Sequence, residues 1–159
     1  MVALMALEHQ THATNLLTRL ALDGSNDKGN VNELVDYLLF IDEARLPGKI
    51  IGTSGFAEKF ATLGPSDRKG RSLRQFDLAH RMMRYPCSYM VYSQSFNTLP
   101  AAAKSVVYAR MWEVLSGRAG TEKYARLTFP DREAVIEILR DTKKDLPPYF
   151  QPLRSATTD

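Results

Sequence analysis

The sequence predicts an all-α protein, a single-domain irregular helical bundle of about six to seven helices. Apolar residues recur at helical spacing in most of the long segments, and turns rich in Gly, Pro, Asn and Asp separate them. A length of 159 residues and a hydrophobic content of 44% suit one domain with one core. We expect this domain to span residues 1–150, followed by a mobile tail over residues 151–159.

The first helix is expected from Val2 to Leu22. Leu4 and Leu7 fall outside its main apolar stripe and predict neighbours on two sides of the helix. At 100° per residue, the stripe and its flank contain Val2, Met5, Ala6, His9, Ala13, Leu16, Leu17 and Leu20.

Two helices are expected in the next part of the chain. The second helix is predicted from Val31 to Arg45, with Asn30 as its N-cap and Pro47 just beyond its end. A short amphipathic helix over residues 54–63 follows, and Gly64 supplies its C-terminal stop.

The stretch over residues 71–100 is the densest in aromatic and sulfur side chains, so we expect it to form the central layer of the core. A helix is predicted from Leu73 to Arg84, and Pro86 forces a break after it. Residues 88–96 are predicted to be helical, although the tyrosines and Val91 would also suit a strand.

Two long helices complete the predicted fold. Thr98 is expected to cap the first of them, with Pro100 in its first turn and its end near Ser116. Thr128 with Asp131 is expected to cap the second.

Composition excludes several classes of protein and site. The net charge of +3 and pI near 9.0 fall short of a nucleic-acid-binding composition. A single cysteine excludes an intramolecular disulfide, a thiolate-rich zinc site and a CxxCH haem-attachment motif within this sequence. No apolar run approaches the ~20 residues that span a bilayer. The start MVALMALEHQ has no signal-peptide features and favours an internal piece of a longer chain.

Glu8, His9 and His12 form the one cluster with metal-ligand chemistry. These side chains lie about one turn apart on a helix, so they can converge on one ion. Their order is not the HExxH of zinc proteases, and a second Glu-x-x-His helix of a di-iron bundle is missing. The alternative is a core histidine, His9, that is satisfied by hydrogen bonds, with Glu8 and His12 as a local pair.

Cys87 is the candidate reactive thiol, and His80 is the base it would need. On a continuous helix the two residues would be two turns apart, and no third group orients them. The alternative is that Cys87 is a small buried hydrophobic residue. No nucleophile elbow, P-loop or dinucleotide-binding motif is present.

The strongest basic concentration is a candidate surface for an anion or an acidic partner, because arginine gives bidentate contacts. The alternative is a solvated connector and helix face that Asp67 and Asp77 balance in part. The concentration contains Arg68, Lys69, Arg71, Arg74, Arg81 and Arg84.

Several segments together resemble a known family: VALMALEHQTHATNLLTRL, IDEARLP with GTSGFAEKF, RKGRSLRQFDL, RYPCSYMVYSQSFNTLP and AVIEILRDTKKDLPPYF. They are similar to a C-terminal helical region of long, largely uncharacterised exported bacterial proteins, some associated with cytochrome-c-like haem modules. The resemblance implies a periplasmic module, with any covalent haem in a part outside this sequence.

The expected function is therefore a non-catalytic helical module that binds or supports a partner. The family resemblance implies a redox or haem-bearing partner, either another protein or an upstream region of a longer polypeptide. The alternative is a metal- or haem-binding protein that uses Glu8, His9 and His12. Under the first hypothesis no cofactor is bound within the chain, and under the second it holds haem or a divalent metal.

Overall fold

A computed structural model describes residues 1–24, 27–52 and 54–154. Over these ranges the chain forms a single all-α domain without β-strands, in agreement with the predicted fold class. The α-helices are α1 (Val2–Asp23), α2 (Lys28–Leu38), α3 (Phe56–Thr62), α4 (Gln94–Asn97), α5 (Ala101–Leu115) and α6 (Phe129–Thr142). Two 3-10 helices are η1 (Tyr89–Tyr92) and η2 (Glu122–Tyr124).

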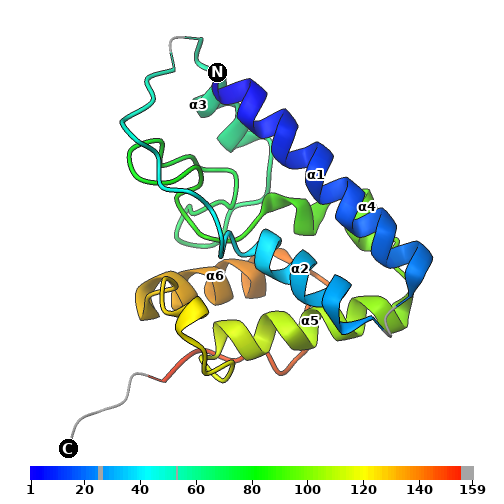
Figure 1. Cartoon of the computed structure of the whole chain (residues 1–159). Coiled ribbons are helices and arrows are strands. Elements are labelled where there is room, and N and C mark those ends of the chain that lie inside the picture. Colours follow the sequence, from blue (N-terminus) through cyan, green and yellow to red (C-terminus); the bar gives the residue numbers. More distant parts are fainter. Residues whose placement is uncertain (25–26, 53, 155–159) are drawn as a thin grey trace, which may run out of the picture.

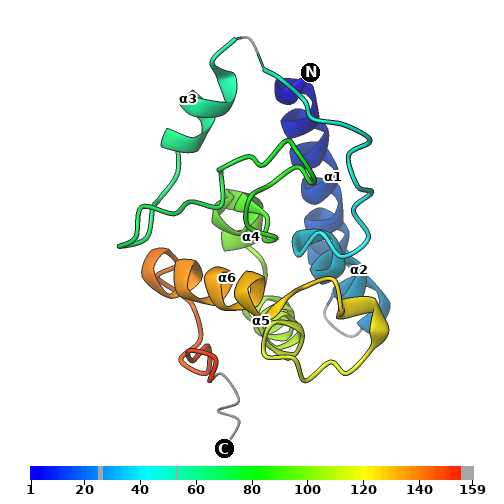
Figure 2. The same cartoon turned by 90° about the vertical axis from the view of Figure 1, so that its left-hand side faces the viewer.

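The helices surround one continuous core. Helix α1 contacts α2, α3 and α4, while α2 also contacts α5, and α5 contacts α6. In Figure 1 α1 runs along one side of the molecule and α5 and α6 lie together at the other end, with α2 between them. Figure 2 shows that α3 lies apart from α5 and α6, while the irregular segment that follows α3 reaches α6. Tyr89 and Phe96 are among the largest fully buried side chains, as expected for the central stretch.

Helix α1 matches its predicted extent and buried face. Met5 is half-buried, and the other seven predicted positions are buried. Leu4 and Leu7 are exceptions to the prediction, because their exposed fractions are 66% and 58%. The neighbours of α1 pack against its main stripe and leave these two leucines in solvent.

Helix α2 is shorter than predicted and has a different cap. Asp27, not Asn30, is the N-cap, and its carboxylate accepts the N–H groups of Gly29 and Asn30. The helix ends at Leu38 because Phe40 adopts a left-handed conformation with φ 53°. The Ile41 N–H donates to Asp36 O and the Phe40 N–H to Tyr37 O, which forms a Schellman motif. Glycine usually occupies this position, so no residue before Pro47 indicates the end of the helix.

The predicted helix from Leu73 to Arg84 is wrong. This segment turns back on itself: the Asp77 N–H donates to Met82 O, and an isolated bridge joins Phe76 to Met83. Leu78 occupies the turn with φ 60° and accepts the Ile50 N–H at 2.8 Å. Pairing with the loop before α3 therefore overrides the helical spacing of the apolar residues.

The predicted helix over residues 88–96 is divided into η1 and α4. Ser93 is extended between them, and its hydroxyl accepts the Phe96 N–H at 3.1 Å. Helix α5 begins after Pro100, which is its N-cap instead of a first-turn residue, while the Thr98 hydroxyl donates to Gln94 O. Thr128 caps α6 as predicted, through a 3.2 Å bond from the Asp131 N–H.

The end of the described chain packs against α5. Phe150 is buried, and its ring lies 5.3 Å from the Trp112 ring and 6.0 Å from the Tyr108 ring, measured between centroids. Leu153 also packs against the core. Of the predicted tail over residues 151–159, residues 155–159 lie outside the described residues.

Candidate functional site

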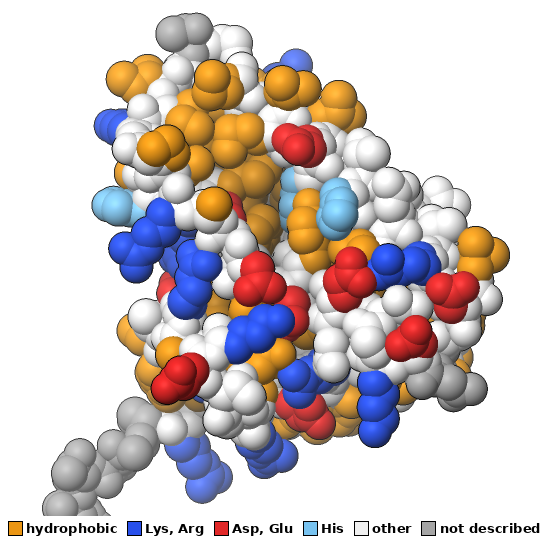
Figure 3. All heavy atoms as spheres, viewed as in Figure 1, with side chains coloured by type: hydrophobic (Ala, Val, Ile, Leu, Met, Phe, Trp, Pro, Cys, Tyr) orange, Lys and Arg blue, Asp and Glu red, His pale blue; other side chains and the backbone are white. Residues whose placement is uncertain are grey.

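A pocket of about 710 Å³ lies between α1, α2 and the turn that follows α2. Figure 3 shows it as a hollow with an apolar floor, with histidine and acidic side chains along its edge. Its lining combines apolar and aromatic side chains with titratable ones: Met5, Glu8, His9, His12, Leu16, Asn32, Glu33, Asp36, Tyr37, Phe40, Asp42, Glu43, Met82 and Lys123.

His9 is at the base of this pocket and is only 5% exposed. Its Nε2 lies 2.6 Å from the Ser88 hydroxyl oxygen. The imidazole stacks on Tyr37 and Phe40, with ring centroids 5.0 and 4.9 Å apart. Burial, helped by the neighbouring His12, lowers the pKa of His9 from 6.5 to about 4. The imidazole is therefore neutral at pH 7.

The contact between His9 and Ser88 is structural. Ser88 is fully buried, and its hydroxyl oxygen also accepts the Met90 N–H at 3.1 Å. Its own N–H donates to Leu38 O, which fixes this residue against the end of α2. A serine with no exposed surface cannot reach a substrate atom, so this pair does not form a nucleophile and its base.

Tyr37 and Phe40 form the aromatic wall. The Tyr37 hydroxyl donates to His9 O at 3.4 Å, and the His12 ring lies 4.5 Å from the Tyr37 ring. Burial raises the pKa of Tyr37 to about 12, and the charges of Glu8 and Glu43 raise it further. The phenol is neutral at pH 7. The left-handed turn at Phe40 places the second ring against His9, and strained backbone of this kind is concentrated at functional sites.

Three of the five lining carboxylates are paired with cations. Lys123 Nζ lies 2.5 Å from Asp36 Oδ2 and 3.5 Å from Asp42 Oδ2. Arg19 is paired with Glu33. Over residues 1–24, 27–52 and 54–154, the other two lining carboxylates, those of Glu8 and Glu43, form no ion pair. The pocket thus keeps free negative charge beside its aromatic wall.

Glu43 connects the pocket to the irregular segment. Its Oε1 accepts the Met82 N–H at 2.9 Å. Burial raises the pKa of Glu43, although that hydrogen bond and the charges of Arg126 and Arg81 act in the opposite direction. The Arg126 guanidinium bonds backbone oxygens instead, those of Ile41 and Glu43.

All three predicted metal ligands line this pocket, yet they point to different surroundings. His9 Nε2 is used by Ser88, while Glu8 and His12 are exposed. In the part of the chain that the structure describes, no three His, Cys, Asp or Glu side chains are arranged to hold a metal ion. Metal or haem binding through Glu8, His9 and His12 stays a prediction without a geometric argument in its favour.

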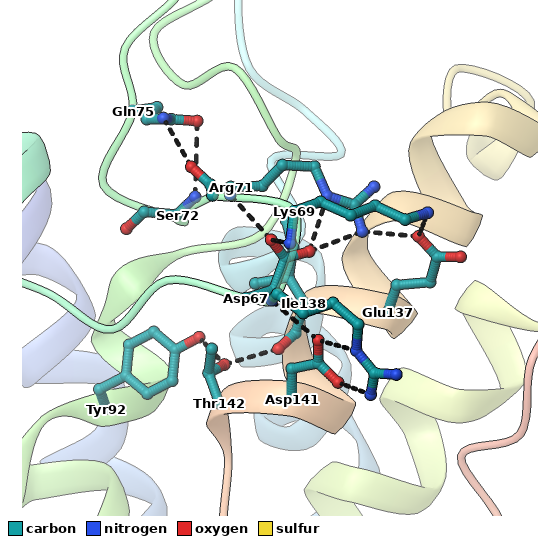
Figure 4. Close-up of polar contacts among 12 residues, drawn as sticks. Asp67, Lys69, Arg71, Ser72, Gln75, Tyr92, Glu137, Ile138, Asp141 and Thr142 are labelled. Carbon is teal, nitrogen blue, oxygen red and sulfur yellow. Dashed lines mark hydrogen bonds and ion pairs between the residues drawn. The ribbon is translucent and has the colours of Figure 1, made fainter.

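Part of the predicted basic surface is paired with carboxylates of α6, as Figure 4 shows for Lys69 and Arg71. Arg68 binds Asp141 through two side-chain hydrogen bonds of 2.8 and 2.5 Å. Lys69 and Arg71 both bind Glu137, at 2.8 and 2.6 Å. These contacts join the connector over residues 67–71 to one face of α6.

Asp67 is the centre of this cluster of ion pairs, and its side chain has no exposed surface. It accepts the backbone N–H groups of Lys69 and Arg71, and the Arg71 Nε–H at 2.7 Å. Burial alone would raise the pKa of Asp67, but the hydrogen bonds and charge of Arg71 outweigh it and lower the pKa. Arg68 lowers the pKa of Asp141 to about 2.

The remaining three arginines are spread over separate environments. Arg81 binds Asp131 with distances of 2.8 and 3.2 Å. The Arg74 guanidinium lies over Phe60 and Tyr89, 4.7 and 4.9 Å from the ring centroids. Arg84 is exposed. The six basic residues therefore do not form one free docking surface, and anion or partner binding there stays a prediction.

Cys87 is fully buried, and burial raises its thiol pKa to about 12. His80, the proposed base, has an 88% exposed side chain and lies 3.7 Å from Asp77. The thiol stays protonated at pH 7 and away from solvent. This environment fits the alternative of a small buried hydrophobic residue.

The sequence singled out the α1 side of the pocket and missed the opposite wall. Phe40 and Glu43 were assigned to the predicted helix up to Arg45, which hid the turn that brings them to His9. Met82 was placed on a helix that does not form, and Lys123 belongs to η2, which was not predicted. An aromatic residue near a helix end gives no signal of a left-handed turn.

Comparison with protein-family models, with curated proteins and with solved structures gives no match to this chain. The resemblance to exported, cytochrome-associated proteins therefore stays an expectation. None of the helices described here is both long and apolar enough to cross a membrane.

Proposed function

We propose that this chain is a non-catalytic binding module whose ligand occupies the pocket between α1 and α2. The observation that carries the proposal is the pocket itself. Its volume of about 710 Å³ falls within the roughly 300–1,000 Å³ typical of small-molecule sites. Aromatic and apolar side chains form its floor, and polar groups lie at its edge. In small-molecule sites the apolar lining encloses the ligand and the polar groups fix its orientation.

Two features of the pocket support binding instead of catalysis. His9 is neutral, stacks on two rings and is hydrogen-bonded to the buried Ser88. These contacts hold the imidazole in place and occupy the Nε2 that would transfer a proton. Among the residues that the structure describes, the lining contains no Ser, Thr or Cys side chain that would act as a nucleophile. The residues that line it are thus suited to enclosing an apolar group.

The test is the binding of a small neutral apolar probe, para-tert-butylphenol, measured by calorimetry at pH 7. We expect saturable binding of one probe per chain. Met5→Trp adds bulk inside the pocket and should weaken binding at least about tenfold, or about 1.4 kcal/mol. Asn32→Trp, on the exposed α2 side of the lining, should have the same effect if Met5→Trp disturbs folding.

Leu7→Trp is the matched control. Leu7 is on the same helix but is exposed and does not line the pocket, so binding should be retained. Circular dichroism of each variant checks that the helices are intact. Unsaturable binding, or equal binding by the folded Met5→Trp, Asn32→Trp and Leu7→Trp variants, would refute the proposed site.

A further inference from the structure

The lining of the pocket is unbalanced in charge. The lining has five carboxylates and one lysine. Lys123 is shared between Asp36 and Asp42, and Arg19 outside the lining pairs with Glu33, so two of the five carboxylates have no ion-pair partner among the described residues. Because His9 is neutral at pH 7, it adds no positive charge at the base. A low-dielectric wall of rings beside unpaired carboxylates strengthens the local field that a ligand experiences.

The unpaired charge is concentrated near one ring. Glu8 comes from α1 and Glu43 from the turn after α2, and both act electrostatically on the Tyr37 phenol. In the described residues, neither carboxylate has an ion-pair partner. Aromatic faces attract cations as well, so the rings and the carboxylates favour the same sign of charge in the ligand.

We propose that the ligand of this pocket is a small organic cation: an ammonium group, placed near Glu8, Glu43 and Tyr37, on an apolar or aromatic body that fills the floor. This inference rests on the proposed function and adds the chemical class of the ligand. The pocket volume of about 710 Å³ suits a molecule of drug-like size. The separation of the carboxylates onto two elements, without a three-ligand cluster among the described residues, suits a diffuse ammonium better than a metal ion.

The experiment compares two probes of the same shape. One is para-hydroxyphenyl-trimethylammonium, and the other is its neutral isostere, para-tert-butylphenol. We expect the cation to bind about tenfold more tightly at low ionic strength and pH 7, because the carboxylates of Glu8 and Glu43 attract its charge. Calorimetry on the full chain gives both dissociation constants under identical conditions.

The double variant Glu8→Gln with Glu43→Gln tests the assignment of the charge. Glutamine keeps the shape of the side chain and the oxygen that accepts the Met82 N–H. The ratio of the two dissociation constants should fall from about ten toward one, because the carboxylates that attract the cation are gone. Glu58→Gln is the control: this exposed residue on α3 lies outside the lining, so the ratio should stay near ten.

The outcomes separate this inference from the proposed function. If the neutral isostere binds as tightly as the cation, the inference is wrong and the apolar binding site remains. If the preference for the cation survives in the double variant, the charge is held elsewhere and the inference is also wrong. If neither probe binds, both proposals fail.

Discussion

The pocket between α1 and α2 and the cluster around Asp67 use similar residues in opposite ways. Both bring charged side chains from distant parts of the sequence together. In the Asp67 cluster the cations of residues 68–71 bind carboxylates on the connector and on α6. In the pocket, Glu8 and Glu43 form no ion pair with any of the described residues and lie beside an open volume.

This difference shows what distinguishes a structural cluster from a candidate site. In the Asp67 cluster each backbone donor of the turn has an acceptor, so the charges fix one conformation. In the pocket the rings of Tyr37 and Phe40 are packed against His9, but the carboxylates of Glu8 and Glu43 at the edge form no ion pair among the described residues. The number of charged residues alone does not distinguish a candidate site from a structural cluster. Residues 67–71 form the denser group of charges in the sequence, yet their charges are paired.

The largest expected effect comes from breaking the Asp67 cluster. Asp67→Ala should lower the free energy of unfolding by about 4 kcal/mol, because the Arg71 Nε–H and two backbone N–H groups lose their buried charged acceptor, although Arg71 keeps its ion pair with Glu137. Urea denaturation followed by circular dichroism measures this change. Asp42→Ala, at the edge of the pocket, is the comparison and should cost less than about 1 kcal/mol, since its carboxylate is exposed. Equal costs would remove the contrast between the two regions.

A smaller effect is expected from acidification of the pocket. The folded pKa of His9 is about 4, below its ordinary value of 6.5, so the unfolded chain binds the proton first as pH falls. The stability that depends on a neutral, buried His9 is fully present above pH 6.5 and is lost progressively down to about pH 4. At about 1.4 kcal/mol per pH unit, this loss amounts to about 3 kcal/mol.

The variant His9→Gln should lack this part of the pH dependence, and His80→Gln should keep it because His80 is exposed. The raised pKa of Glu43 acts in the opposite direction, but it is common to all three proteins and cancels in the comparison. The pKa values of Asp67 and Asp141 are lowered, so these two carboxylates change the free energy of unfolding mainly at lower pH. Identical unfolding profiles of wild type and His9→Gln between pH 7 and pH 4 would contradict the burial of a neutral His9.

Regular helices were the part of the fold that sequence periodicity predicted well. Helix α1 and the capped start of α6 follow from apolar spacing and from Thr128. The turns at Phe40 and Leu78 did not follow, because both residues adopt positive φ without being glycine. Contacts remote in sequence hold these conformations, such as the stacking of Phe40 on His9.

The same limit applies to the candidate site. His9, Glu8 and His12 were recognised because helical spacing places them on one face. Helical spacing does not reveal that Ser88, 79 residues away, contacts the imidazole of His9 and occupies its Nε2. The basic connector was also recognised, but its partners Glu137 and Asp141 lie on α6, and no local pattern joins the two segments.

Binding in the α1–α2 pocket is tested most directly by an amide chemical-shift map of the labelled chain during titration with para-tert-butylphenol. We expect shifts centred on His9, His12, Tyr37 and Phe40, with residues 67–71 nearly unchanged. Shifts centred on residues 67–71, or spread evenly over the exposed leucines of α1, would contradict the assignment of the α1–α2 pocket as the binding site.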